Sequence, residues 1–151
     1  MGAVVRCQVS FRHGNDCAEQ IGEVAMTEVR WLNRPEEHDF PAAADYLALI
    51  ADPATVTTAI ARLRVAPLIH KKAKDILRAA QLPLLKADNA HVVADLSKIH
   101  KQQPLSPILL VRGDLRAGVP LQIADGYHRV CASYFTDENT DIPVVMASLE
   151  S

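Results

Sequence analysis

The sequence predicts a small mixed α/β fold, and two observations support this prediction. From residue 39 to about residue 80, apolar side chains recur every three or four positions, which is typical of helices that bury one face. After residue 83, short apolar runs of strand length alternate with turn residues and helical stretches. A chain of 151 residues can form one well-cored domain with an appendage, so we expect a small mixed sheet with helices, preceded by a helical N-terminal cap.

Three helices are expected in the N-terminal cap, which we place at residues 26–82. The first begins at Asp39 and runs to about residue 50, before the Asp52-Pro53 pair interrupts it. Asp52 then provides the N-cap of a second helix, which ends ahead of residue 67. The third is expected over residues 68–80, with apolar side chains on one face and basic side chains on the other.

The sheet domain is expected at residues 83–151. Asp88 or Asn89 is a suitable N-cap for a helix that ends near residue 101. Residues 108–111 are continuously apolar, which predicts a central strand covered on both faces. A glycine-containing turn then leads to a return strand, a short helix and a last strand, which we expect at residues 121–124, 127–135 and 142–147.

The first 25 residues show neither helical nor strand periodicity over a useful length. A second methionine follows at Met26, and beyond it the sequence begins to show residues suited to packing. We expect residues 1–25 to be disordered, or to be an extension that precedes the native start.

The composition excludes several classes of protein. The net charge of -2 argues against non-specific coating of nucleic acid, and no apolar run approaches the roughly 18 residues of a membrane-spanning helix. The three cysteines are too widely spaced for a disulfide framework, and His128 and Cys131 lack the second pair of ligands that structural zinc needs. We therefore expect a cytoplasmic protein without membrane association, and no haem, flavin or structural zinc.

The most informative segment is residues 123–129, with the sequence Ile-Ala-Asp-Gly-Tyr-His-Arg, in which a strand ends, turns at glycine and opens a helix. A helix N-terminus offers unsatisfied N–H groups to an anion, and Gly126 lets the anion come close. Arg129 has a planar fork suited to phosphate, and His128 can donate a hydrogen bond or move a proton. Asp125 can hold Mg²⁺ or simply cap the helix, and Tyr127 can stack on a base or simply pack.

Residues 82–147 resemble the N-terminal domain of ParB chromosome-partition proteins and sulfiredoxin. The resemblance lies in the order of the elements, in the Leu-Ser-Pro segment that leads into the apolar strand at 105–111, and in the Asp-Gly-Tyr-His-Arg motif at 125–129. In that family the motif contacts the phosphates of a nucleoside triphosphate. The resemblance therefore implies a ParB/sulfiredoxin-like fold and nucleotide binding through Gly126, Tyr127, His128 and Arg129.

Differences from the family narrow the expected chemistry. Tyr127 stands where sulfiredoxin has its catalytic cysteine, so we do not expect reduction of peroxiredoxin, and Cys131, one helical turn later, is expected to be a buried core thiol. Tyr127 and His128 replace the Glu and Arg of the ParB motif. Stand-alone proteins with an Asp-Gly-x-x-Arg motif include a kinase of free serine and ParB-like nucleases, so the fold does not fix the reaction.

The expected function is binding of a nucleotide or another phosphorylated small molecule, with Mg²⁺ accompanying it. Whether the chain is an enzyme is left open. If it is, the reaction class is phosphoryl transfer or phosphate-ester hydrolysis. Asp125 would hold the metal or act as base, His128 would move a proton and Arg129 would stabilise charge on the transferring group.

An alternative function comes from uneven charge. Residues 62–86 hold seven Lys or Arg and one acid, a net +6, which leaves -8 for the rest of a chain of net charge -2. Lys71, Lys72, Lys74 and Arg78 would then lie on the helix expected at 68–80 and contact a nucleic-acid backbone. This predicts a non-catalytic nucleic-acid-binding or regulatory module, and a protein-interaction domain without a ligand is a third hypothesis.

Overall fold

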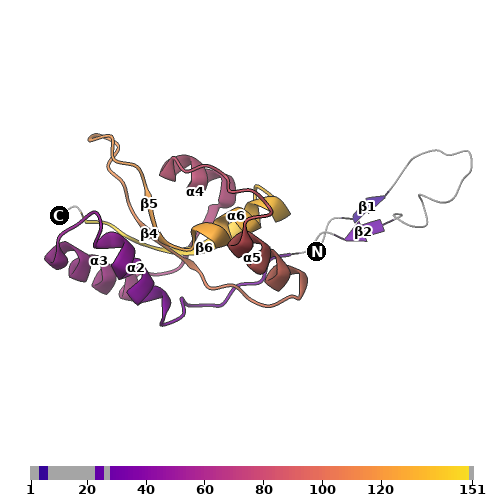
Figure 1. The fold of residues 1–151 in the computed structure, drawn as a ribbon, viewed down its shortest axis with the longest axis horizontal. Coiled ribbons are helices and arrows are strands. Elements are labelled where there is room, and N and C mark those ends of the chain that lie inside the picture. Colours follow the sequence, from indigo (N-terminus) through magenta and orange to yellow (C-terminus); the bar gives the residue numbers. More distant parts are fainter. Residues whose placement is uncertain (1–3, 7–22, 26–27, 150–151) are drawn as a thin grey trace, which may run out of the picture.

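A four-stranded mixed sheet lies at the centre of the computed structural model, which describes residues 4–6, 23–25 and 28–149. The strand order is β3-β6-β4-β5, in which β6 and β4 are parallel and the two edge strands are antiparallel to their neighbours. The predicted α/β fold class is therefore confirmed (Figure 1). The strands are β3 (Ile69–Lys72), β4 (Ile108–Val111), β5 (Gln122–Asp125) and β6 (Asp141–Ala147).

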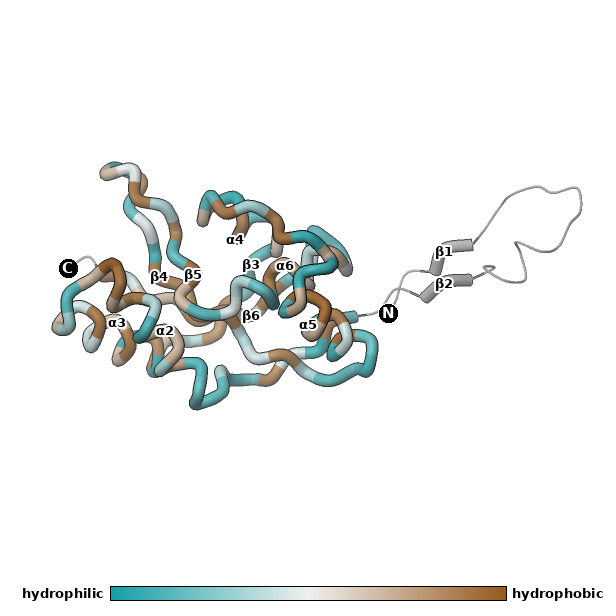
Figure 2. Tube along the Cα trace, viewed as in Figure 1, coloured by the Kyte–Doolittle hydropathy of each residue, from teal (hydrophilic) through white to brown (hydrophobic). Residues whose placement is uncertain are grey.

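Helices cover both faces of the sheet, and alternate residues of β4 show how. Leu109 and Val111 pack with the helices of one face, whereas Ile108 and Leu110 pack with those of the other. All four side chains are at least 95% buried, so β4 is the central strand that its apolar sequence predicted. Figure 2 shows hydrophobic segments, in brown, in the sheet and in the helices around it. The first face carries α2 (Asp39–Leu47) and α3 (Pro53–Val65); the second carries α4 (Ala73–Ala80), α5 (Ala90–His100) and α6 (Tyr127–Thr136).

Two predicted N-caps are present. The Asp52 carboxylate accepts a hydrogen bond from Thr55 N at 2.7 Å, and Pro53 occupies the first turn of α3. The Asn89 side chain accepts from the first-turn N–H groups of α5. Among the described residues α3 is the longest helix at 13 residues, and none is long and apolar enough to cross a membrane.

The helix predicted over residues 68–80 is wrong in its first half. Residues 69–72 form β3, an edge strand that pairs with β6, and α4 begins only at Ala73. The cause is tertiary, because the hydrogen bonds offered by the free edge of β6 outweigh a helical preference spread over one turn. Part of the expected helical cap thus belongs to the sheet, while the division into two domains stays a prediction. The first helix also ends early, at Leu47, and leaves Ile50 exposed.

Within the first 25 residues the structure describes two short strands. These are β1 (Val4–Arg6) and β2 (Glu23–Ala25), which pair antiparallel. These six residues form strands, while the expectation that residues 1–25 are disordered or an extension stays a prediction. For the remainder of the segment it falls outside the described residues.

Candidate functional site

The turn between β5 and α6 requires glycine. Gly126 has a φ of 112°, a conformation that side chains with a Cβ rarely adopt. A Cβ at this position would also lie 2.6 Å from Ile108 Cδ1 and 2.9 Å from Arg129 Nη2. No side chain caps α6, so the N–H groups of its first turn keep their capacity to bind a ligand.

Arg129 belongs to a network that joins the β5–α6 turn to the start of α2 and, through Asp39, to Ser106. Its Nη2 lies 2.6 Å from Asp125 Oδ2 at the end of β5, and its Nη1 lies 3.4 Å from Asp39 Oδ2 at the start of α2. The Ser106 hydroxyl donates to the same Asp39 oxygen and accepts from Glu36 N at 3.0 Å. The Arg129 side chain is 14% exposed and that of Asp39 is 4% exposed, so this network is largely shielded from water.

The two carboxylates outnumber the single guanidinium in this network. Burial raises the pKa of Asp125, the nearby Arg129 opposes that rise, and the neighbouring Asp39 adds to it. Arg129 is thus already engaged on both sides by carboxylates. It orders the wall of the site, and an anionic ligand would have to compete with Asp39 and Asp125 for its guanidinium.

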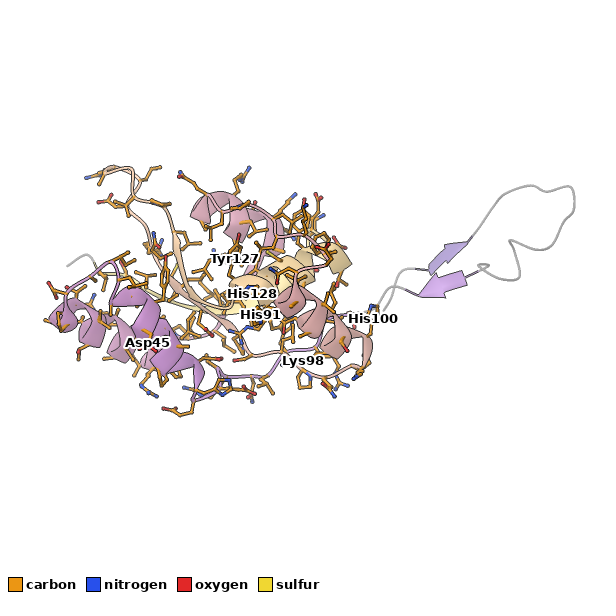
Figure 3. All side chains as sticks on the ribbon, viewed as in Figure 1. Asp45, His91, Lys98, His100, Tyr127 and His128 are labelled. Carbon is orange, nitrogen blue, oxygen red and sulfur yellow. The ribbon has the colours of Figure 1, made fainter. Side chains whose placement is uncertain are left out.

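A second group of polar residues lies on the facing side of α5. The rings of His91 and His128 are 4.7 Å apart between centroids, which brings α5 and α6 together at this point (Figure 3). Burial, followed by the proximity of His91, lowers the pKa of His128. Asp95 lies one turn after His91, and burial raises its pKa against the opposing effect of Arg129. Its carboxylate forms no hydrogen bond or ion pair with any described residue.

These groups line one cavity of about 390 Å³, within the range of roughly 300–1,000 Å³ that small-molecule sites occupy. Its lining holds two formal cations, Lys98 and Arg129, against four carboxylates. With neutral histidines the formal charge of the lining is therefore -2. The residues that carry its polar chemistry are Glu36, His38, Asp39, His91, Asp95, Lys98, Ser106, Asp125, Gly126, His128 and Arg129.

Most of the sequence-predicted motif lies in this cavity, but one member does not. Asp125, Gly126, His128 and Arg129 line it, whereas Tyr127 faces away from it. The Tyr127 hydroxyl donates to the carbonyl of Pro83 at 2.6 Å, and burial raises its pKa. Tyr127 therefore anchors α6 to the loop before α5 and supports the neighbouring His128 ring, as its packing interpretation predicted.

The cysteine of α6 is confirmed as a core residue. Cys131 is fully buried in the cluster between the sheet, α4, α5 and α6. Burial also raises the pKa of its thiol, which disfavours the reactive thiolate.

The residues of the predicted basic helix do not all lie on one helix. Lys71 and Lys72 lie on β3, and only Lys74 and Arg78 lie on α4. Lys72 pairs with Asp141 at 3.5 Å, and Arg78 pairs with Asp75 at 3.1 Å. Lys71 and Arg78 line a different cavity, which contains no aromatic residue that would stack on a base.

Sequence reasoning missed several residues of the site. The sequence around Asp39 predicts only a helix start, and nothing in the sequence indicates that the exposed His91 contacts His128. Ser106 and Lys98 gave no signal. Asp95 did give one, because it lies four positions after His91 and therefore on the same face of α5.

One group of described residues could hold a metal ion. His38 Nε2 lies 3.1 Å from Glu36 Oε2 and 3.4 Å from Asp39 Oδ1, and the three ligand atoms are mutually within 4.8 Å. Two carboxylates and an imidazole fit a divalent cation. Asp125, the residue predicted to hold Mg²⁺, is instead engaged by Arg129.

The chain matches no protein-family model, no curated protein and no solved structure. The chemistry of the site is therefore inferred from its own residues.

Proposed function

We propose that this chain binds a nucleotide or another phosphorylated small molecule in the cavity at the start of α6. The observation that carries the proposal is the glycine-led, uncapped N-terminus of α6, which opens into the cavity wall at Gly126 and His128. Lys98 from α5 adds a positive charge to the same cavity. The resemblance of the Asp-Gly-Tyr-His-Arg motif to the phosphate-binding motif of ParB-like proteins supports this proposal.

The ligand is proposed to bind together with Mg²⁺, because a lining of formal charge -2 would repel a bare phosphate. Glu36 and Asp39 offer the oxygen ligands that Mg²⁺ prefers, and His38 lies between them. Bound there, Mg²⁺ would neutralise negative charge on the phosphates. Binding is tested by titrating the protein with nucleoside triphosphates in the presence and absence of Mg²⁺.

The reaction class that suits these residues is phosphoryl transfer or phosphate-ester hydrolysis. Asp95 is the best-placed general base, because its carboxylate lines the cavity without a partner among the described residues and burial raises its pKa. Lys98 and His128 would position the phosphate, and His128 would move a proton. Asp125 acts through Arg129, which it holds in place.

Asp95→Asn is expected to abolish turnover of the ligand yet make the protein more stable. Because burial raises the Asp95 pKa above its unfolded value, the charged carboxylate destabilises the fold once the pH exceeds the folded pKa. Removing the charge should therefore raise the melting temperature in neutral and alkaline buffer, and this gain should disappear below the unfolded pKa of about 4. Thermal melts across pH, together with a phosphate-release assay, measure both effects.

Asp45→Asn is the matched control, since Asp45 is an exposed acid of α2 outside the cavity. It should change neither turnover nor stability by much. If Asp95→Asn lowers the melting temperature, or leaves turnover intact, the role given to Asp95 is wrong.

A further inference from the structure

A second cavity of about 520 Å³ is lined by α4 and by the hairpin arm, residues 112–121, which joins β4 to β5. Figure 1 shows this arm and α4 extending from the sheet. Its floor is apolar, formed by Ile76 of α4, Leu110 of β4, Leu121 before β5 and Met146 of β6. The volume is that of a small-molecule site. We call this cavity the hairpin groove, and it shares no lining residue with the cavity at the start of α6.

The walls of the hairpin groove are held in place. Leu121 N donates to Ala79 O at 3.1 Å, which fastens the return strand of the hairpin to α4. Farther out on the arm, Asp114 Oδ1 accepts from Arg116 N at 3.0 Å and from Ala117 N at 3.3 Å. Because the backbone of the arm is fixed by these bonds, the groove is a preformed feature of the fold.

Three exposed basic residues are among those that line the hairpin groove. Lys71, Arg78 and Arg112 line it, and Asp75 is the only carboxylate among its lining residues. Asp75 pairs with Arg78, whereas Lys71 and Arg112 form no ion pair with any described residue. The groove thus combines an apolar floor with a net charge of +2 among its lining residues, and it has no aromatic lining on which a base would stack.

We propose that the hairpin groove binds a free aliphatic carboxylate. Its chain would lie on the floor formed by Ile76, Leu110 and Met146, and its carboxylate would meet Arg112 and Lys71. A single negative charge at one end of an apolar chain matches the distribution of charge over apolar surface in the groove. This binding is independent of the phosphate site, so either assignment can fail without the other.

Decanoate and decyltrimethylammonium, which share a chain length and differ in charge, are the probes. Calorimetric titration should show one decanoate bound per chain, and decyltrimethylammonium should bind at least about tenfold more weakly. Arg112→Ala should weaken decanoate binding about tenfold, the loss expected for one charge-assisted contact. Ala79→Trp should abolish binding, because Ala79 is exposed and its replacement fills the groove without disturbing the core.

Lys101→Ala is the matched control, because Lys101 is an exposed lysine outside both cavities. It should leave decanoate affinity unchanged. Amide NMR signals locate the site independently of any variant, and residues 110–121 should shift on adding decanoate. The proposal would be overturned by equal affinity for the two probes, by NMR shifts confined to residues 125–129, or by the absence of decanoate binding. Self-association abolished by Ala79→Trp would also overturn it, by assigning the groove to a second copy of the chain.

Discussion

Replacing Arg129 with methionine is expected to destabilise the protein by about 3 kcal/mol, the lower end of the cost of removing one partner from a buried ion pair. The lower end applies because the partners are not fully enclosed; the Asp125 side chain is 23% exposed. Without the guanidinium, Asp39 and Asp125 would face each other with no described Lys or Arg in an ion pair with either of them. Methionine keeps much of the apolar stem, so the loss reports on charge.

The loss of stability in the Arg129→Met variant should become smaller at acidic pH. Burial already raises the pKa of Asp125 and Arg129 opposes this, so removing Arg129 raises that pKa further. A carboxyl with a raised folded pKa regains its stability as the pH falls below that pKa. Chemical denaturation across the pH range measures the effect.

Arg78→Met is the matched control for Arg129→Met. Arg78 also pairs with a carboxylate three residues away, but its side chain is 83% exposed. Exposed ion pairs contribute about 0–1 kcal/mol to stability, so the Arg78→Met variant should lose little stability. Equal losses for Arg78→Met and Arg129→Met would show that the Arg129 network contributes no more than a surface pair.

Gly126→Ala is expected to destabilise the protein by about 3 kcal/mol, with two separate causes. The positive φ of 112° costs energy for any residue with a Cβ, and the added methyl would lie 2.6 Å from the fully buried Ile108. Relief of that clash would shift the start of α6 and move His128 and Arg129 out of position. Ligand binding should therefore fall together with stability, as calorimetry and denaturation would show.

Gly118→Ala separates the two causes. Gly118 also has a positive φ, of 73°, but a Cβ there would meet nothing within 4 Å. The Gly118→Ala variant should lose only the conformational part of the stability, about 1 kcal/mol, and should retain ligand binding. If Gly126→Ala costs no more than Gly118→Ala, the close approach of Ile108 to the turn is not a constraint on the site.

Elements with strong local signals were predictable from the sequence. The continuous apolar run of β4, the caps at Asp52 and Asn89, and the glycine turn at 126 are each determined by a few neighbouring residues, and the structure confirms them. β3 is the opposite case. Its Ile-His-Lys-Lys sequence has no alternating apolar pattern, and it is a strand because the edge of β6 lies beside it.

For the same reason, only part of the candidate site could be predicted from the sequence. The motif at 125–129 is contiguous, so its chemistry can be recognised locally. The Asp39–Arg129 pair joins residues 90 positions apart, and nothing near Asp39 in the sequence indicates that it is buried. The unpaired state of Asp95 likewise depends on which residues of α6 pack against α5.

The central claim, that the cavity at the start of α6 binds a phosphorylated ligand with Mg²⁺, is tested most directly by thermal melts with nucleotides and Mg²⁺. The melts compare the unsubstituted protein with two variants, Lys98→Ala and Lys101→Ala. Both lysines lie near the end of α5, but of the two only Lys98 lines the cavity. A ligand at 100 times its Kd stabilises the folded state by about 2.7 kcal/mol. We expect a rise of several degrees that needs Mg²⁺, persists in Lys101→Ala and is lost in Lys98→Ala. No rise with any nucleotide, or the same rise in both variants, would contradict the account.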